Sequence, residues 1–309
     1  MRTEISSSSG IGEADAPAPR SRDYKTVIVN AVQLAYVERG SGDAVIFVHG
    51  GISDLRTWTH QLPAFAERYR PIAYSRRYCW PNTEIPDDVD DQMLPHVEDL
   101  AELIRSFDAA PAHLVGNSWG GFICLLTALR HPELVRSLTA EEPAVLPLLA
   151  SNKPKPQELL KLFTTRPRTG LAMMSFFMNG IAPAIKAFKN GDADAGVQAF
   201  ALNVDGRDFY EARPDDVKEQ QSANWKTLRN SLMGAGLPAF SEADARSIKT
   251  PTLLVTADKS HPLLPRLTRR LGELLPNVEQ VNIHGAPHIM HYAKPDAVNR
   301  SVLDFIARH

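Results

Sequence analysis

The sequence predicts an α/β fold in which a mainly parallel β-sheet carries helices on both faces and an α-helical insertion interrupts the alternation. Short β-rich segments alternate with helical segments along most of the 309 residues, as in parallel sheets covered by helices. Between residues 144 and 240 the strand signals stop and only helical segments remain. We therefore expect a disordered tail over 1–22, a core over 23–143 and 241–309, and a helical insertion over 144–240.

Each strand is expected from a short apolar or β-rich run bounded by turn residues. The expected strands are Lys25–Asn30, Val32–Glu38, Ala44–Val48, Pro71–Ser75, Ala112–Val115, Val135–Thr139, Leu253–Thr256 and Val278–Ile283. Apolar residues at helical spacing predict the covering helices. These are Thr57–Tyr69, His96–Phe107, Trp119–Arg130, Pro265–Leu275 and Pro295–Arg308. Ligands of such sheets bind at the carboxyl ends of the strands, so the loops that follow strands are the place to look for chemistry.

Composition narrows the function classes. The chain is 43% hydrophobic and 23% charged, with a net charge of −2 and no Lys/Arg run, which argues against nucleic acid as a partner. We find no apolar run of transmembrane length and no apolar signal-peptide region near the start, so we expect no membrane insertion and a cytoplasmic protein. Two cysteines, scattered histidines and no G-x-G-x-x-G motif lead us to expect no metal and no organic cofactor.

The stretch AHLVGNSWGGF, residues 112–122, carries the strongest chemical signal. A buried strand runs into Gly116-Asn117-Ser118-Trp119-Gly120, and a helix follows directly. This G-x-S-x-G pattern between a strand and a helix is a nucleophile elbow, in which a sharp turn presents the serine hydroxyl at the top of the sheet. Side chains at the two glycines would collide with neighbouring backbone. We therefore predict that Ser118 is a catalytic nucleophile.

A second glycine-rich loop follows the apolar strand Ala44–Val48 and reads His49-Gly50-Gly51. Upstream of an elbow, such a loop is expected to supply one donor of an oxyanion hole. The backbone N–H groups of Gly51 and Trp119 would then face the same developing oxyanion. We expect Gly50 to border the substrate and His49 to brace the loop.

Together these motifs resemble the α/β-hydrolase family, through VHGG, GNSWGG, the helical insertion, the strand ending in TAD and the GAPH sequence near the end. The resemblance implies an eight-stranded, mostly parallel sheet and identifies the insertion as a cap. It also implies that His288, in Gly285-Ala286-Pro287-His288, is the general base. His291 and His284 are the runners-up for this role.

The triad acid departs from the commoner family pattern. Many members carry the acid after the seventh expected strand, as the aspartate of a G-E-x-D pattern, and Ser260 falls on that aspartate position while Asp258 falls on the glutamate position two residues earlier. A smaller set of relatives, which includes haloalkane dehalogenases and zearalenone lactonases, carries the acid after the preceding core strand. Counting from Val135 favours Glu142 there, whereas anchoring on Pro143 would favour Glu141. We prefer Glu142, with Asp258 and Glu141 as the alternatives.

The resemblance implies a serine hydrolase, and we expect it to cleave a small-to-medium hydrophobic carboxylic ester or lactone. Because the nucleophile is a serine, epoxide-hydrolase and dehalogenase reactions, which pass through an aspartate ester, are not expected. A C–C bond hydrolase, a cofactor-free dioxygenase and a hydrolase-like ligand receptor remain the alternatives, and the chain could be a monomer or a homodimer.

Substrate contacts are harder to predict from the sequence. We expect Trp80, Met174, Phe177 and Trp225 to line the acyl pocket. Arg76 and Arg77 are weaker candidates for binding a substrate carboxylate.

Overall fold

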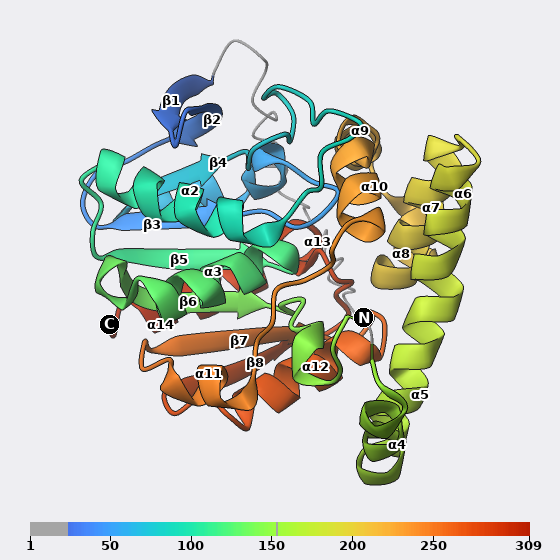
Figure 1. The fold of residues 1–309 in the computed structure, drawn as a ribbon. Helices are drawn as coiled ribbons and strands as arrows, with labels where there is room; N and C mark the ends of the chain where they lie inside the picture. The colour runs from blue at the N-terminus through green and yellow to red at the C-terminus, as the bar shows by residue number, and fades with distance from the viewer. Residues whose placement is uncertain (1–23, 153) are drawn as a thin grey trace, which may run out of the picture.

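A computed structural model describes residues 24–152 and 154–309. The expected tail over residues 1–22 lies outside the described residues. The described residues form a central sheet, two helical layers and a group of helices at one end of the sheet (Figure 1).

The sheet has eight strands in the order β1-β2-β4-β3-β5-β6-β7-β8. Only β2 runs antiparallel to its neighbours β1 and β4, and every other pair is parallel. The strands are β1 Lys25–Val29, β2 Val32–Glu38, β3 Ala44–Val48, β4 Arg70–Tyr74, β5 Ala112–Asn117, β6 Val135–Glu141, β7 Thr252–Ala257 and β8 Val278–Ile283. The predicted α/β fold with an eight-stranded, mostly parallel sheet is confirmed.

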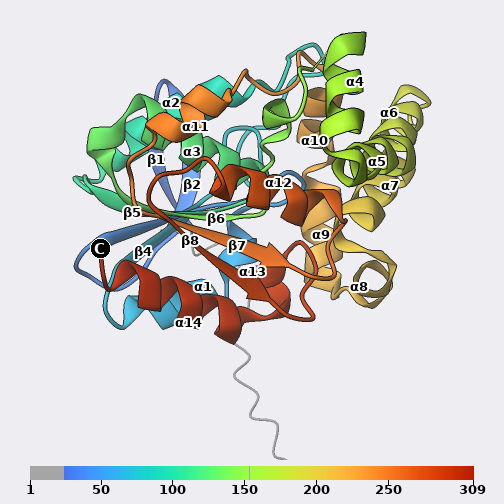
Figure 2. The same ribbon diagram turned by 90° about the horizontal axis from the view of Figure 1, so that it is seen from below.

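Helices cover both faces of the sheet, as Figure 2 shows. On one face lie α2 (Met93–Ser106), α3 (Trp119–Arg130), α11 (Glu242–Ser247) and α12 (Leu263–Gly272). On the other lie α1 (Gln61–Ala66), α13 (Met290–Ala293) and α14 (Pro295–Ile306). All residues of β3 and β5 are buried, and this burial on both faces explains why β3 reads as a continuous apolar run, AVIFV, in the sequence.

Between β6 and α11 the described chain forms helices and connecting loops but no strand. After the 3₁₀ turn η3 (Leu146–Leu148), the helices are α4 (Pro156–Thr165), α5 (Pro167–Phe176), the π-helical turn η4 (Phe177–Ile181), α6 (Ala182–Lys189), α7 (Ala193–Asp205), α8 (Arg207–Ala212), α9 (Asp215–Ala223) and α10 (Trp225–Met233). In Figure 1 these helices stand beyond the arrowheads of the parallel strands. The segment thus lies over the loops that follow the parallel strands.

One continuous helix of this segment, Pro167–Lys189, is long and apolar enough to cross a membrane by length and composition, with a mean hydropathy of 1.3. It joins α5, η4 and α6, and only 22% of its most apolar window is buried. The expectation of no membrane insertion stays a prediction.

The structure corrects one expected helix. The segment Thr57–Tyr69 is divided between a 3₁₀ turn, η1 (Leu55–Trp58), and the short helix α1. The Asp54 carboxylate begins η1 early, because it accepts a hydrogen bond from the backbone N–H of Arg56 at 3.0 Å. This division leaves Thr57 inside the turn with its side chain buried.

Candidate active site

Ser118 lies at the sharp turn between β5 and α3. Its backbone has φ 52° and ψ −114°, a conformation that is costly for a residue with a side chain. Two hydrogen bonds hold the turn against the neighbouring strand: the Ser118 N–H donates to Glu141 O at 2.8 Å, and Ala144 N–H donates to Ser118 O at 3.1 Å. The surrounding sheet therefore fixes a strained nucleophile in place.

The two glycines of the elbow are required by close backbone approach. A Cβ on Gly120 would lie 2.1 Å from Val48 O, and a Cβ on Gly116 would lie 2.6 Å from Gly120 O. No side-chain rearrangement can relieve contacts with backbone atoms. The G-x-S-x-G spacing thus allows α3 to pack directly on the ends of β3 and β5.

The loop after β3 passes beside Ser118. A Cβ on Gly50 would come within 3.5 Å of the Ser118 Cβ and 2.8 Å of Asn117 Oδ1, whereas a Cβ on Gly51 would meet nothing within 4 Å. Gly51 therefore borders open space. Its backbone belongs to the cavity lining together with Gly50.

Two buried residues brace this loop. Arg76 donates from Nη2 to Gly50 O at 2.8 Å and from its backbone N–H to His49 Nε2 at 3.0 Å. Burial and the Arg76 charge hold the pKa of His49 well below its usual value, so His49 is neutral and accepts that bond. The Arg76 guanidinium carbon also lies 4.7 Å from the centre of the Trp119 ring. Arg76 thus contacts the ring of Trp119, one expected oxyanion donor, and the carbonyl of Gly50, which directly precedes Gly51, the other expected donor.

His288 and Glu142 form a buried pair next to the elbow. His288 Nδ1 lies 2.8 Å from Glu142 Oε2. The other oxygen, Oε1, accepts from the Ser260 hydroxyl at 2.7 Å and from Ala257 N–H at 3.0 Å. Ser260, which occupies the commoner acid position, orients Glu142 in this structure.

The environment of His288 favours its protonated form. Burial acts to lower the pKa, but the hydrogen bond and charge of Glu142 outweigh it, so the His288 pKa is raised above its usual value. A carboxylate at Nδ1 fixes the tautomer that leaves Nε2 able to accept a proton. His288 can therefore act as a base toward a neighbouring hydroxyl.

Glu141 serves a different histidine. It is the last residue of β6, and its Oε2 lies 2.7 Å from His291 Nδ1. His291 Nε2 in turn lies 2.8 Å from Thr57 Oγ1, and Trp58 stacks on the imidazole at 4.2 Å. Consecutive glutamates thus orient two different histidines, Glu141 facing His291 and Glu142 facing His288.

Asp258 does not reach either histidine of these pairs. Its Oδ1 accepts from the Gly285 N–H at 2.6 Å, and its other oxygen lies 3.5 Å from His284 Nδ1. It holds the loop that carries His288, at the rim of the site. The geometry thus brings Ser118, His288 and Glu142 together, with Glu141 and Asp258 in supporting positions.

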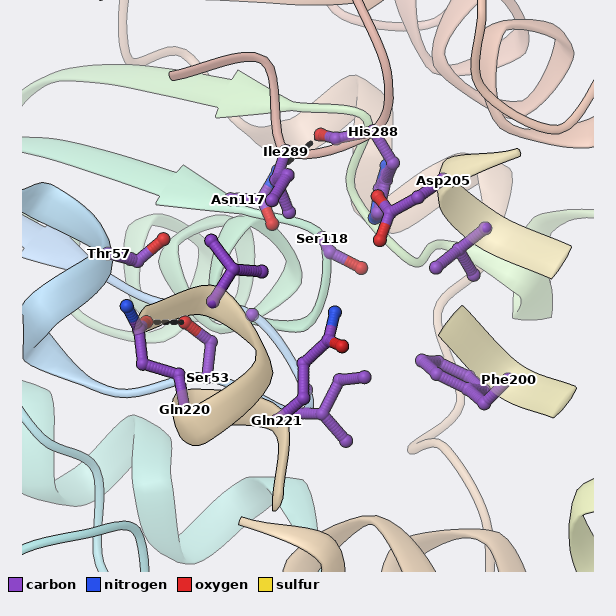
Figure 3. A pocket seen from close by; sticks show the side chains of 15 residues that line it. Ser53, Thr57, Asn117, Ser118, Phe200, Asp205, Gln220, Gln221, His288 and Ile289 are labelled. Atoms are coloured by element: carbon purple, nitrogen blue, oxygen red, sulfur yellow. Dashed lines mark hydrogen bonds between the residues drawn. The ribbon is translucent and has the colours of Figure 1, made fainter. Parts of the chain in front are cut away.

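A cavity of about 480 Å³, with the space open to solvent included, runs over Ser118 (Figure 3). The core contributes Gly50, Gly51, Ile52, Ser53, Thr57, Asn117, Ser118, His288 and Ile289, and helices α7 and α9 contribute Phe200, Val204, Asp205, Val217, Gln220 and Gln221. The lining is mixed, with polar side chains on both sides of the serine. Among these described lining residues there is no Lys or Arg.

The pocket residues expected from aromatic and Met content lie elsewhere. Met174 and Phe177 are 51% and 53% exposed on the outer side of the helical segment. Trp80 packs under the Arg56 guanidinium at 3.7 Å, and Trp225 stacks with Phe188. None of these four expected residues is among the lining residues, because apolar composition alone does not tell an outward from an inward helix face.

The two arginines considered for substrate binding are also absent from the cavity lining. Arg77 makes a bidentate pair with Asp99, with both distances at 2.6 Å. Arg76 is occupied at the Gly50 loop, as described above.

Asp205, Thr57 and the glutamine pair of α9 are cavity residues that sequence reasoning missed. Asp205 ends α7 just before Gly206, whose φ of 82° stops the helix. An acidic residue followed by a helix-ending glycine is common, so the pattern carries no functional signal. Gln220 and Gln221 lie in a helix of low apolar content, DDVKEQQSA, that looks solvent-exposed in sequence. Among the described residues there is no group of three or more His, Cys, Asp or Glu side chains arranged to hold a metal ion.

Several known proteins are similar to this chain in sequence. The family model for the alpha/beta hydrolase fold matches residues 43–295. A putative non-heme bromoperoxidase of Mycobacterium tuberculosis (strain CDC 1551 / Oshkosh) is 29% identical over 89% of this chain and 98% of its own length. The bifunctional epoxide hydrolase 2 of Rattus norvegicus is 22% identical over 95% of this chain but 58% of its own length.

Solved structures resemble the chain in fold. An enol-lactonase from Burkholderia xenovorans LB400 superposes with a TM-score of 0.68 at 17% identity, covering 92% of this chain and 100% of the enzyme. A thermophilic esterase from Thermogutta terrifontis gives a TM-score of 0.71 at 16% identity, with 92% and 98% covered.

Proposed function

Because the chain belongs to the α/β-hydrolase family, we propose that it is a serine hydrolase that cleaves a carboxylic ester or lactone through an acyl-enzyme on Ser118. The observation that carries this proposal is the buried Glu142–His288 pair beside a strained serine in one cavity. A nucleophile, a base and a group that orients the base are the components that acyl transfer needs.

The reaction proceeds in two halves. His288 Nε2 takes the Ser118 proton while Oγ attacks the carbonyl carbon, and the Gly51 and Trp119 N–H groups stabilise the oxyanion. Collapse breaks the bond to the alkoxide, which receives the proton from His288. Water then attacks the acyl-enzyme with His288 again as base, which releases the acid and restores Ser118. These steps use no metal or organic cofactor.

Three features guide the choice of substrate. Apolar side chains of Ile52, Phe200, Val204 and Val217 can contact a short acyl or alcohol chain. The absence of Lys and Arg from the described lining disfavours a substrate carboxylate next to the reacting carbon. Serine at the elbow cannot form the aspartate ester of epoxide opening, so the epoxide-hydrolase relative is not a guide to this reaction.

The division of the chain fits this proposal. Helices α7 and α9 supply six of the lining residues, while the nucleophile, base and acid come from loops that follow strands of the sheet. We propose that residues 144–240 act as a cap, and that 23–143 and 241–309 form the catalytic core. A cap that supplies binding residues sets specificity without altering the catalytic groups.

The test is hydrolysis of p-nitrophenyl acetate and butyrate by wild type and by Ser118→Ala. We expect turnover by the wild type and a near-background rate for the variant at equal folded fraction. Turnover that survives in the variant would remove Ser118 from the mechanism. A folded wild type without activity on any ester or lactone would favour the C–C hydrolase, dioxygenase or receptor alternatives.

A further inference from the structure

Asp205 is a buried carboxylate that the proposed mechanism does not use. It ends α7, is 3% exposed, and points into the cavity next to the His288 side chain (Figure 3). The Ile289 backbone N–H donates to the carboxylate, but its Oδ1 has no hydrogen-bond partner. A buried carboxylate oxygen without a donor is costly, and a ligand that supplies a donor removes that cost.

The charges around Asp205 leave it without a cationic side chain of its own. His288 and His291 are the basic groups that face it, and each is already paired with a glutamate, Glu142 or Glu141. The other described lining residues are neutral. The cavity therefore has an anionic side, located against the catalytic base.

We propose that Asp205 binds a hydrogen-bond donor, preferably an ammonium group, on the alcohol part of the ester substrate. This inference rests on the proposed function, because it assigns the two parts of the substrate relative to Ser118 and His288. It makes amino-alcohol esters the preferred substrate class.

The role of His288 determines which part of the ester, alcohol or acyl, lies beside Asp205. The imidazole must deliver its proton to the leaving alkoxide, so the alcohol part lies against His288 and the acyl part lies away from it. A donor within two or three atoms of the ester oxygen therefore falls beside Asp205. The acyl chain is left to the apolar side of the cavity.

The ionisation of Asp205 is compatible with this role. Burial raises the pKa of Asp205 to about 6, with the neighbouring His288 acting in the opposite direction. Near pH 7 the carboxylate is therefore mainly charged and available to a cation. A bound ammonium would favour the charged form further.

Two esters of matched shape test the proposal at pH 7 in a pH-stat. The first, 2-(dimethylammonio)ethyl acetate, carries one N–H donor and a positive charge, and the second, 3-methylbutyl acetate, replaces the nitrogen by carbon. We expect wild type to prefer the first in kcat/KM by about 10- to 100-fold, as hydrogen bonds to charged groups give. Asp205→Asn should abolish most of this preference, read as the ratio of kcat/KM on the two esters, because any loss shared by both esters cancels in that ratio.

The exposed residue Asp208 offers a matched control, because Asp208→Asn removes the same charge on the neighbouring helix α8 and should preserve the preference. A wild type that hydrolyses both esters equally overturns the proposal. Equal losses on both esters in Asp205→Asn, with the preference for the ammonium ester retained, would also overturn it, since Asp205 would then act only through His288.

Binding separates this inference from the proposed function. Ser118→Ala cannot form the acyl-enzyme, so calorimetry with the two intact esters measures recognition alone. We expect the ammonium ester to bind more tightly than its isostere, and Ser118→Ala/Asp205→Asn to lose the difference. Equal binding of both esters by Ser118→Ala refutes the role of Asp205. A wild type that hydrolyses neither ester, while Ser118→Ala still binds the ammonium ester more tightly than its isostere, would instead refute the hydrolase proposal.

Discussion

Replacing Glu142 with glutamine tests the assignment of the triad acid with almost no change in shape. Glu142 Oε1 accepts from Ala257 N–H and from the Ser260 hydroxyl, and Oε2 faces His288 Nδ1. In Glu142→Gln the amide oxygen must remain at the Oε1 position, because Ala257 N–H can only donate. The amide NH₂ then points at His288 Nδ1.

This orientation imposes the wrong tautomer on the base. An NH₂ group at Nδ1 requires Nδ1 to accept, which places the imidazole proton on Nε2, where it cannot take the proton of Ser118. Wrong-tautomer variants of serine hydrolases lose about 10⁴ in kcat, and we expect a loss of ~10³ to 10⁴ here. That corresponds to about 4 to 5.5 kcal/mol of transition-state stabilisation.

The assay is kcat/KM on a p-nitrophenyl ester over a range of pH, with Glu141→Gln and Asp258→Asn as controls. Glu141→Gln disturbs the buried His291 pair and should reduce stability by about 1 to 3 kcal/mol, with less than about a tenfold loss of rate. Asp258→Asn should retain activity within about threefold, because Asp258 bonds the loop at its rim. Glu142→Gln with a tenth or more of wild-type activity, or a larger loss in either control, would refute the reasoning.

Three further predictions follow from the same geometry. The kcat/KM should fall as the pH falls through the His288 pKa, and this acid limb should lie above the usual histidine range, because the hydrogen bond and charge of Glu142 outweigh the lowering effect of burial on that pKa; a limb below the usual range would contradict the pairing. Gly120→Ala should lose about 3 kcal/mol or more of stability in chemical denaturation, since its Cβ would meet backbone at 2.1 Å, whereas Gly51→Ala should fold normally, with open space around its Cβ. Arg76→Met should lower kcat by about 10-fold or more with little change in KM, because Arg76 braces the oxyanion loop through Gly50 O; a pure KM effect would count against that role.

The fold and the elbow could be predicted because local rules decide them. The apolar run of β3 reflects full burial, and the elbow glycines reflect backbone contacts across a strand–turn–helix unit. These features depend on neighbours in the chain, or on a topology that the alternation of elements already implies. The choice of His288 rests instead on the resemblance of Gly285-Ala286-Pro287-His288 to the family's histidine loop, and its role as the base stays a prediction.

The triad acid is predicted by counting residues from Val135 at the start of β6, and no sequence motif identifies it. Glu141 and Glu142 differ by one position, and that position decides which histidine the carboxylate contacts, His291 or His288. Glu142 leaves the strand at a φ of 39°, a turn that no residue preference announces. The separation of the two Glu–His pairs is therefore visible only once β6, η1 and the last loop are placed together.

The residues that line the cavity could not be predicted from the sequence, because tertiary packing decides which side chains face it. Met174 and Phe177 read as pocket residues but face outward, whereas Asp205 and Gln221 read as surface residues and line the cavity. Their positions depend on how the helical segment docks over the sheet. Helical periodicity gives the angle between side chains on one helix, not which side meets the core.

The most direct test of the central claim is covalent labelling of the nucleophile. A fluorophosphonate reacts with an activated serine, and intact-mass and peptide mass spectrometry identify the labelled residue. We predict a single adduct on Ser118 that forms in step with loss of esterase activity, much slower labelling in His288→Ala, and no adduct in Ser118→Ala. An adduct on a different residue that accompanies the loss of activity, or an active wild type that remains unlabelled, would contradict the account.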